Sequence, residues 1–248
     1  MTLKNKEQIA LMRKANQIVK DTLNLLIDHT KEGVSTYELD RLAHEYIVRQ
    51  NAVPSFLGYA GFPASICVSI DCEVVHGIPS KHRFLEEGQI VSYDCGAIFQ
   101  GWNGDAARTV GVGIISDEKQ KLIDVTEQCF FKGVESIVPD KTRLGDLGYA
   151  IQQHAESFGY GVVRELVGHG IGRDMHEDPD VPNYGTPGHG LRLFSGMTIA
   201  IEPMIAMGTE KVDFMSDGWT VKTRDRKPAS HYENTIAITE NGVEILSL

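Results

Sequence analysis

The sequence predicts an α+β protein in which two similar halves share one sheet. The predicted elements run in the order helix, helix, strands, helix, helix, strands. Two segments, "GQIVSYD" and "GMTIAIE", each place a carboxylate six residues after a glycine at the end of an apolar strand. Neither a Pro/Ser-rich linker nor a low-complexity segment divides the chain. We therefore expect residues 1–248 to form a single domain around a shared sheet.

The first half opens with two predicted helices. Residues 1–26 carry apolar residues at helical spacing with charges between them, which predicts an amphipathic helix rather than a signal peptide or transit sequence. A second helix is predicted over residues 35–50. Ser35 is its expected N-cap, and Glu38, three residues later, would complete a capping box.

Strands are expected to follow these helices. Residues 54–70 are rich in Gly, Pro and aromatic residues and end in strand-like alternation. Residues 88–115 read as two strands joined by a turn near Gly101–Gly104.

The second half repeats this order. Residues 116–137 are predicted to form a helix with Ser116 as N-cap. A further helix over 142–159 would be capped by Thr142 and ended by Gly159. Strand-like patterns then occupy two segments, 196–207 and 231–246.

The segment "ELVGHGIGRDMHEDP", residues 165–179, holds two histidines seven residues apart. Glycine costs about 1 kcal/mol per helical position relative to alanine, so the alternate glycines at 168, 170 and 172 argue against a helix. We expect a short strand or loop whose backbone passes close to another part of the molecule. Taken alone, the segment is best interpreted as a glycine-rich surface loop that carries two solvated histidines.

Composition excludes several classes of protein. A net charge of −10 argues against a general nucleic-acid binder, which would show a basic stripe. Among the printed residues, no apolar run approaches the ~18 residues of a membrane span. The four cysteines have no C-x-x-C spacing and are expected to be reduced thiols, which favours a cytoplasmic protein.

Four carboxylates occur inside or at the edge of predicted strands: Asp94, Asp105, Glu202 and Glu233. Side chains alternate between the faces of a strand, and each of these acids shares its face with small or polar residues. Each could instead be a strand-end acid that is solvated or paired with a base. A solvated or paired strand-end acid is the poorest explanation for Glu202, because "TIAIEPMIAM" surrounds it with apolar or small residues. A buried unpaired carboxylate costs several kcal/mol, so a shared cation explains all four acids best.

Adding one imidazole from the histidine segment gives a set of two Asp, one His and two Glu. Four carboxylates balance two divalent ions, and a pair of metals about 3.5–4 Å apart is a recognised hydrolytic arrangement. Oxygen ligands with one nitrogen and no thiolate favour Mn²⁺, Fe²⁺ or Co²⁺ over a Cys-based structural zinc site, with Zn²⁺ as a further candidate. The wide spacing of the set forms no local motif.

Five segments together resemble the type I methionine aminopeptidases: "VVHGIP", "YDCGAIFQGWNGDAARTV", "GHGIGRDMHEDP", "AIEPM" and "YENTIAIT". The resemblance covers nearly the whole chain. It implies the pita-bread fold, with two pseudo-symmetric halves around a central antiparallel sheet and a dinuclear metal site. The metal ligands it implies are Asp94, Asp105, His169, Glu202 and Glu233.

The resemblance also implies a reaction and its participants. A hydroxide bridging two metals would attack the carbonyl after the first residue, with Glu202 as ligand and proton shuttle. His76 and His176 would hold the substrate and stabilise the scissile amide. The implied methionine pocket is lined by Tyr59, Phe62, Cys67, His76 and Trp219.

The expected substrates are peptides and nascent chains that begin with methionine and have a small second residue, processed at the ribosome by a monomeric enzyme. The chain starts almost directly at its first predicted helix and shows no type II helical insertion, so it resembles the bacterial form. It departs from the family pattern at Met175, where relatives often carry an aromatic residue, which affects the expected shape of the pocket.

Two other functions fit parts of this pattern. A prolidase-like peptidase would share the fold but usually has a longer N-terminal domain. A non-catalytic pita-bread module that binds RNA or protein would be expected to lose ligands, whereas all five positions are filled here.

Overall fold

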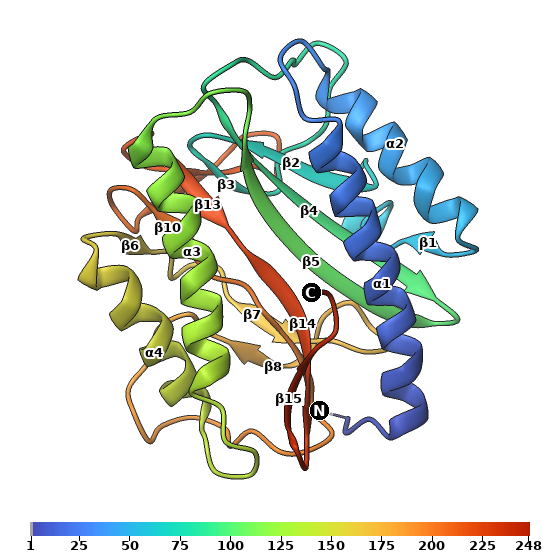
Figure 1. The fold of residues 1–248 in the computed structure, drawn as a ribbon, viewed down its shortest axis with the longest axis vertical. Helices are drawn as coiled ribbons and strands as arrows, with labels where there is room; N and C mark the ends of the chain where they lie inside the picture. Colours follow the sequence, from blue (N-terminus) through green and yellow to red (C-terminus); the bar gives the residue numbers. More distant parts are fainter. Residues whose placement is uncertain (1) are drawn as a thin grey trace.

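The computed structural model describes residues 2–248 and follows the predicted order of elements (Figure 1). The helices and the 3₁₀ turn are α1 (Lys6–Asp28), α2 (Thr36–Arg49), η1 (Tyr59–Gly61), α3 (Asp117–Glu135) and α4 (Leu144–Ser157). The strands are β1 (Val53–Pro54), β2 (Ile66–Ile70), β3 (Glu73–Val75), β4 (Ile90–Phe99), β5 (Trp102–Gly111), β6 (Gly161–Val162), β7 (Gly168–Gly170), β8 (Glu177–Val181), β9 (Thr198–Ile201), β10 (Met204–Ala206), β11 (Val212–Phe214), β12 (Val221–Thr223), β13 (Ala229–His231), β14 (Glu233–Thr239) and β15 (Gly242–Ile245).

A nine-stranded sheet forms the centre of the protein. Its main path runs β1-β4-β5-β14-β9-β7-β8, with β2 added to β4 and β15 added to β14. These pairs are antiparallel, as the sequence predicts. β5 and β14 join the two halves of the chain, because β5 pairs with β4 on one side and with β14 on the other.

The two halves have separate hydrophobic cores on this shared sheet. In the first, α1 and α2 pack against β2, β4 and β5 through a cluster that includes Leu23, Leu39 and Tyr93. In the second, α3 and α4 pack against β9 and β14 through a cluster that includes Leu122, Phe130 and Ile236. Figure 1 shows the two helix pairs on opposite sides of the long central strands. The expected arrangement of two similar halves is therefore confirmed.

Helix caps agree with the sequence in part. The side chains of Ser35 and Ser116 accept hydrogen bonds from the backbone N–H groups of the third helical residues of α2 and α3. The reciprocal capping box predicted at α2 is found instead at α1, between Asn5 and Gln8. Thr142 is not the N-cap of α4, since Arg143 occupies that position.

The Thr142 side chain organises the loop before α4. Its hydroxyl donates to the Ser136 carbonyl at 2.9 Å and accepts from the Val138 N–H at 2.8 Å. A polar residue near a helix start resembles an N-cap in sequence, but here the hydroxyl is committed to the preceding turn. The β4–β5 turn also lies slightly earlier than expected, at Gln100 and Gly101.

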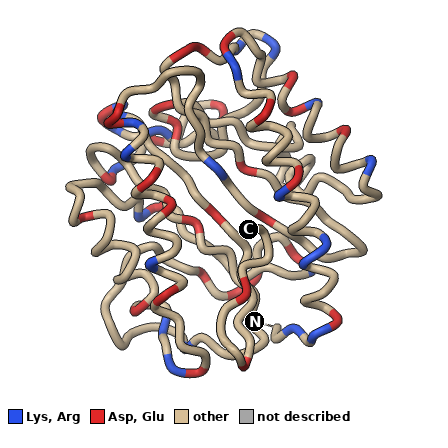
Figure 2. Tube along the Cα trace, viewed as in Figure 1, with Lys and Arg blue, Asp and Glu red and all other residues tan. Residues whose placement is uncertain are grey.

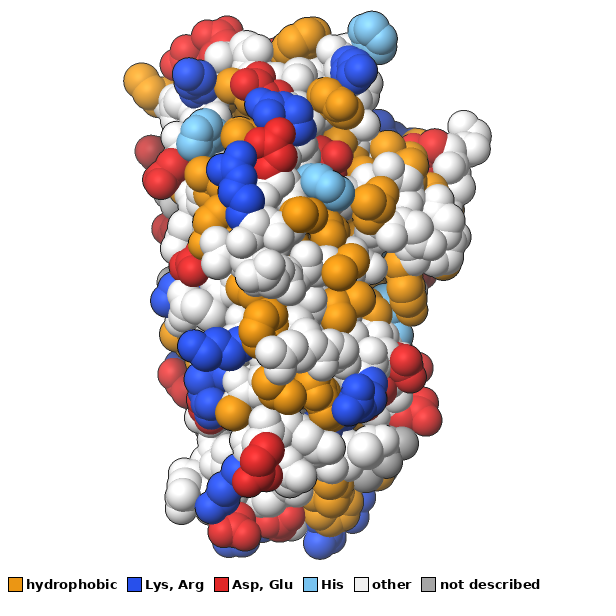
Figure 3. Space-filling view, turned by 90° about the vertical axis from the view of Figure 1, so that its right-hand side faces the viewer, with side chains coloured by type: hydrophobic (Ala, Val, Ile, Leu, Met, Phe, Trp, Pro, Cys, Tyr) orange, Lys and Arg blue, Asp and Glu red, His pale blue; other side chains and the backbone are white. Residues whose placement is uncertain are grey.

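Acidic residues lie on the central strands as well as on the outer helices (Figure 2). On the side of the molecule seen in Figure 3, basic and acidic side chains are interspersed among hydrophobic ones. Within the described residues, no helix has the length and apolar character needed to cross a membrane.

Replacing Thr142 by valine should lower the free energy of unfolding by about 1–3 kcal/mol, because two hydrogen bonds are lost from a site of nearly unchanged shape. Urea unfolding monitored by circular dichroism measures this loss. Ser116→Ala, which removes an ordinary N-cap, is the reference and should cost about 1 kcal/mol. A Thr142→Val protein as stable as wild type would contradict this role for the hydroxyl.

Candidate metal centre

Strand pairing brings the four predicted carboxylates together. Asp94 on β4 and Glu233 on β14 both lie opposite Ala107 of β5, on its two sides. Asp105 stands two residues before Ala107 on the same strand. Glu202 directly follows β9, whose Ile201 pairs with Asn234, so the same register carries Glu202 towards Glu233. The sheet thus gathers side chains that are far apart in the sequence.

The glycines beside His169 explain the composition of the histidine segment. A Cβ atom at Gly168 would lie 2.4 Å from the Ala200 carbonyl oxygen, and one at Gly170 would lie 2.4 Å from that of Asp178. Only glycine lets β7 pass this close to its neighbours. Because β7 is inserted in the sheet, His169 is buried and is no solvated loop residue.

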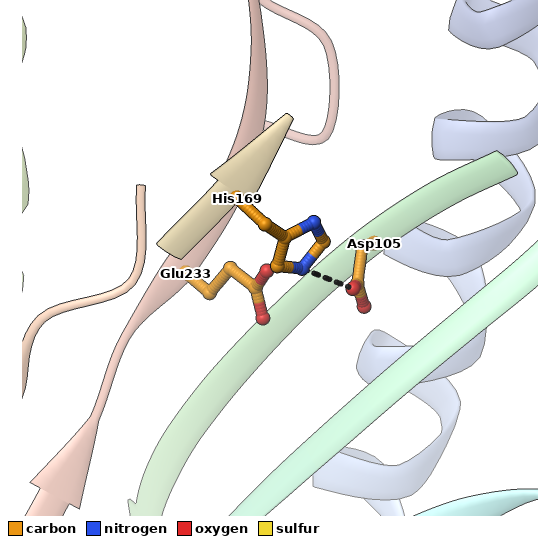
Figure 4. Close-up of side chains that lie close together, drawn as sticks. All are labelled: Asp105, His169 and Glu233. Atoms are coloured by element: carbon orange, nitrogen blue, oxygen red, sulfur yellow. Dashed lines mark ion pairs between the residues drawn. The ribbon is translucent and has the colours of Figure 1, made fainter. Parts of the chain in front are cut away.

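The His169 ring is oriented towards the carboxylates. Its Nδ1 lies 2.9 Å from the Gly170 carbonyl oxygen and donates to it in the neutral ring, which leaves Nε2 unprotonated. Nε2 lies 3.7 Å from Asp105 Oδ2 and 3.6 Å from Glu202 Oε1. Figure 4 shows His169, Asp105 and Glu233 converging from three strands. A second nitrogen bonded to a backbone carbonyl is the usual support for a metal-ligating histidine.

The carboxylates are short of partners within the described protein. Asp105 and Glu233 are 3% and 2% exposed. One oxygen on each of Asp94, Asp105 and Glu233 is buried without any hydrogen bond. Ligand atoms of Asp105, His169 and Glu233 all lie within 4.8 Å of one another. Because buried polar atoms are nearly always satisfied, these oxygens fit a group that binds between them.

Burial and mutual repulsion shift the protonation of this cluster. Burial raises the pKa of Asp94 to about 7. Burial, followed by the charge of Asp94, raises the pKa of both Asp105 and Glu202, and burial with the charge of Asp105 raises that of Glu233. Burial lowers the pKa of His169 to about 4, so its ring is neutral. Four acids and one neutral imidazole are the donor set of hard or borderline divalent cations.

A cavity of about 150 Å³ leads to this cluster. Its wall includes all the predicted pocket residues: Tyr59, Phe62, Cys67, His76 and Trp219. Phe62 and Trp219 meet edge to face, with ring centroids 5.0 Å apart. An apolar pocket that ends in a few convergent polar groups is typical of a small-ligand site.

The two other predicted histidines lie where this cavity meets the carboxylates. His76 has a φ of 61°, a left-handed conformation that is unusual for a residue with a side chain and is often found at functional sites. The ring centroid of His176 is 4.1 Å from that of His169. Tyr59 reaches His176 with its hydroxyl, 2.8 Å from Nδ1. The structure therefore brings together every residue that the sequence assigned to the site.

Comparison with known proteins identifies the family. A family model described as metallopeptidase family M24 matches residues 10–240. The chain belongs to metallopeptidase family M24.

Members of this family from bacteria are close to the chain along its whole length. It is 59% identical to the methionine aminopeptidase of Clostridium acetobutylicum, over 99% of this chain and 98% of that protein. A crystal structure of methionine aminopeptidase from Rickettsia prowazekii superposes with a TM-score of 0.97 at 42% identity, and each chain is covered completely. The resemblance to bacterial type I enzymes and the pita-bread fold are thereby confirmed.

The M24 fold is also shared with a prolidase from Pyrococcus furiosus, which matches with a TM-score of 0.78. At 23% identity this likeness concerns the fold alone, and the chain covers 65% of that structure.

Two residues of this site, Phe56 and His231, were missed from the sequence. Phe56 lines the cavity together with Met175, the position at which the chain departs from the family pattern, and both lie close to Gly96. His231 is fully buried, and its Nε2 lies 3.7 Å from Glu202 Oε2 and 3.9 Å from Glu233 Oε2. Strand alternation would have placed His231 on the face of Glu233, two residues later. Nothing comparable in the sequence marks Phe56 as a pocket residue.

Metal-free protein should lose stability as the pH rises from about 7 to 8, through the folded-state pKa of Asp94 at about 7. The folded-state pKa values of the buried carboxyls are raised above their unfolded values, so the stability that comes from their protonation is present at low pH and is lost as the pH rises through the folded-state values. In this range the buried histidines add no slope, because their lowered folded pKa and the unfolded value of about 6.5 both lie below it.

Thermal unfolding of EDTA-treated protein across this pH range measures the effect. Glu202→Gln, which removes one titrating group, should flatten the slope. Saturating Mn²⁺ should abolish it, since bound cations keep the carboxylates ionised. A melting temperature of the metal-free protein that rises over the same range would argue against a protonated cluster.

Proposed function

We propose that the chain is a divalent-metal-dependent aminopeptidase that removes N-terminal methionine from peptides and nascent proteins with a small second residue. The observation that carries this proposal is the set of four carboxylates and one neutral imidazole, with unpartnered oxygens, at the end of an apolar cavity. The methionine aminopeptidase of Clostridium acetobutylicum, at 59% identity over 98% of its length, supports the choice of substrate.

Five residues would hold two divalent cations: Asp94, Asp105, His169, Glu202 and Glu233. Their unpartnered oxygens and the unprotonated His169 Nε2 are suited to this task. When bound, such ions supply an activated water nucleophile and polarise the scissile carbonyl. We propose Mn²⁺, Fe²⁺ or Co²⁺, with Zn²⁺ as a further candidate, because thiolates are absent from the set.

Glu202 is proposed to move the proton. Its side chain is 13% exposed, so it lies against the cavity and against His169. A carboxylate at this position can accept a proton from the attacking water and pass it to the leaving amine. His76 and His176 border the same space and are proposed to donate hydrogen bonds to the reacting amide as negative charge develops.

The cavity is proposed to select the first side chain. Phe62 and Trp219 form an edge-to-face wall, and Cys67 and Tyr59 complete the pocket from β2 and η1. A thioether is polarisable and packs well on aromatic edges, so methionine suits this lining. The expected preference for a small second residue comes from the family resemblance.

The wider context is also proposed. Residues 1–248 would act as one catalytic domain, since the proposed ligands come from both halves of a single sheet. We propose a cytoplasmic monomer that meets nascent chains at the ribosome. The four free cysteines fit a reducing compartment.

Removal of metal should abolish hydrolysis of Met-Ala-Ser, and Mn²⁺, Co²⁺ or Fe²⁺ should restore it. Hydrolysis of Ala-Pro-Ser under the same conditions is the comparison that separates this activity from an X-Pro peptidase. Product release is followed by chromatography before and after dialysis against EDTA. Full turnover by protein shown to be free of metal would refute the dinuclear proposal.

Capping the α-amine should prevent cleavage. An acetylated Met-Ala peptide lacks the free amine that is expected to bind beside the metals, so its turnover should fall to background. Met-Leu and Met-Lys peptides should react far more slowly than Met-Ala, because their second residues are bulky. Equal rates for capped and free peptides would show that the activity is not that of an aminopeptidase.

His169→Ala and His176→Ala should fail in different ways. The first removes the single proposed nitrogen ligand, so bound metal and melting temperature should both fall. The second leaves the ligand set complete, so metal content should stay near wild type while kcat falls about 10²–10³-fold through loss of a transition-state hydrogen bond. Metal analysis and kinetics on one Met-Ala peptide distinguish them. The opposite pattern of metal loss would reverse the two assignments.

A further inference from the structure

Besides lining the pocket, Tyr59 makes a hydrogen bond to another residue of the site. Its hydroxyl lies 2.8 Å from Nδ1 of His176, which is 117 residues later in the chain. The two rings are tilted by 30°, with centroids 5.3 Å apart. Within residues 2–248, no other hydrogen bond to the His176 ring is found. Among the described residues, the Tyr59 hydroxyl is therefore the only group that is hydrogen-bonded to a ring nitrogen of His176.

The bond has a favoured direction. A neutral imidazole carries its proton on one nitrogen, and the group bonded to the other nitrogen determines which. A phenol O–H is an acid and an unprotonated imidazole nitrogen is a base, so Tyr59 donates and Nδ1 accepts. The proton of His176 then resides on Nε2.

We propose that Tyr59 is a positioning residue that fixes His176 in the tautomer with its proton on Nε2. The inference rests on the proposed function, in which His176 donates a hydrogen bond to the reacting amide. With the opposite tautomer, Nε2 would present a lone pair to the carbonyl oxygen and would repel the negative charge that develops there. The phenol thus sets which ring nitrogen acts as a donor.

The backbone around Tyr59 holds the phenol in place. Tyr59 is 42% exposed, but the turn that carries it is closed by a hydrogen bond from the Phe62 N–H to the Tyr59 carbonyl at 2.9 Å. Ala60, within this turn, has a φ of 46°, in the left-handed region that costs energy for a residue with a Cβ. Phe62 is 4% exposed and anchors the end of the turn against Trp219. This anchored turn sets the backbone position from which the Tyr59 phenol reaches His176.

The first test reads the tautomer directly. Protein labelled with nitrogen-15 in its histidine rings and loaded with diamagnetic Zn²⁺ is compared by NMR as wild type and as Tyr59→Phe. The His176 signals are assigned by their loss in His176→Ala. We expect a protonated Nε2 and an unprotonated Nδ1 in wild type, and a mixture of tautomers in Tyr59→Phe. A protonated Nδ1 in wild type would overturn the inference.

The second test asks whether Tyr59 acts through His176. Tyr59→Phe keeps the aromatic wall, so KM for a Met-Ala peptide should stay within about twofold. Its kcat should fall about twofold to tenfold, the range expected for one neutral hydrogen bond. In the His176→Ala background the same substitution should have no further effect, because the shared partner is already gone. Tyr149→Phe, which removes another exposed phenol hydroxyl on α4, is the matched control and should match wild type.

The outcomes separate this inference from the proposed function. Equal loss of kcat from Tyr59→Phe in both backgrounds would show that Tyr59 acts independently of His176. A change confined to KM would show that Tyr59 only lines the substrate pocket. Either result overturns the positioning role. The tautomer measurement needs no turnover, so it decides the inference even if wild type fails to cleave Met-Ala-Ser, a failure that would refute the proposed function instead.

Discussion

Mutual repulsion among buried carboxylates is the constraint on which the rest of this structure depends. Burial raises the pKa values of Asp94, Asp105, Glu202 and Glu233, and the charges of neighbouring acids raise those of Asp105, Glu202 and Glu233 further. Such a cluster persists only if the surrounding framework is rigid enough to hold the charges together. A central antiparallel sheet, with a separate helix-packed core on each half, supplies that rigidity. The two cores stabilise the fold while the site itself opposes it.

The framework also determines which atoms remain available. His169 uses Nδ1 to donate to the Gly170 carbonyl, and the Asp105 backbone N–H is held by Asn16 and Thr235. These bonds hold the His169 ring and the Asp105 backbone in place, while Oδ1 of Asp105 has no hydrogen-bond partner in the described protein. In His169, Nδ1 is hydrogen-bonded to the backbone of its own strand, and Nε2 faces the carboxylates.

Much of this arrangement could be predicted from the sequence, for identifiable reasons. Helical periodicity predicted α1 and α2. The four carboxylates of the site were predicted from their positions in apolar strands, because a charge such as Glu202 in an apolar segment is costly without a partner. Local capping was harder to predict. Thr142 has the composition of an N-cap, yet its hydroxyl bonds to the preceding turn. The contributions of Phe56 and of the hydroxyl of Tyr59 depend on long-range packing, which leaves no local pattern in the sequence.

The distribution of the proposed ligands along the chain has a consequence for folding. Asp105 and His169 lie on strands of different halves, separated by the whole of α3 and α4. An ion held by both therefore closes a long loop of chain, as a removable cross-link would, and it reduces the entropy of partly opened states in which one half has detached. A chain whose second half has not docked would not bring all the proposed ligands together, so binding of a cation by this set would favour the fully docked state over partly opened ones.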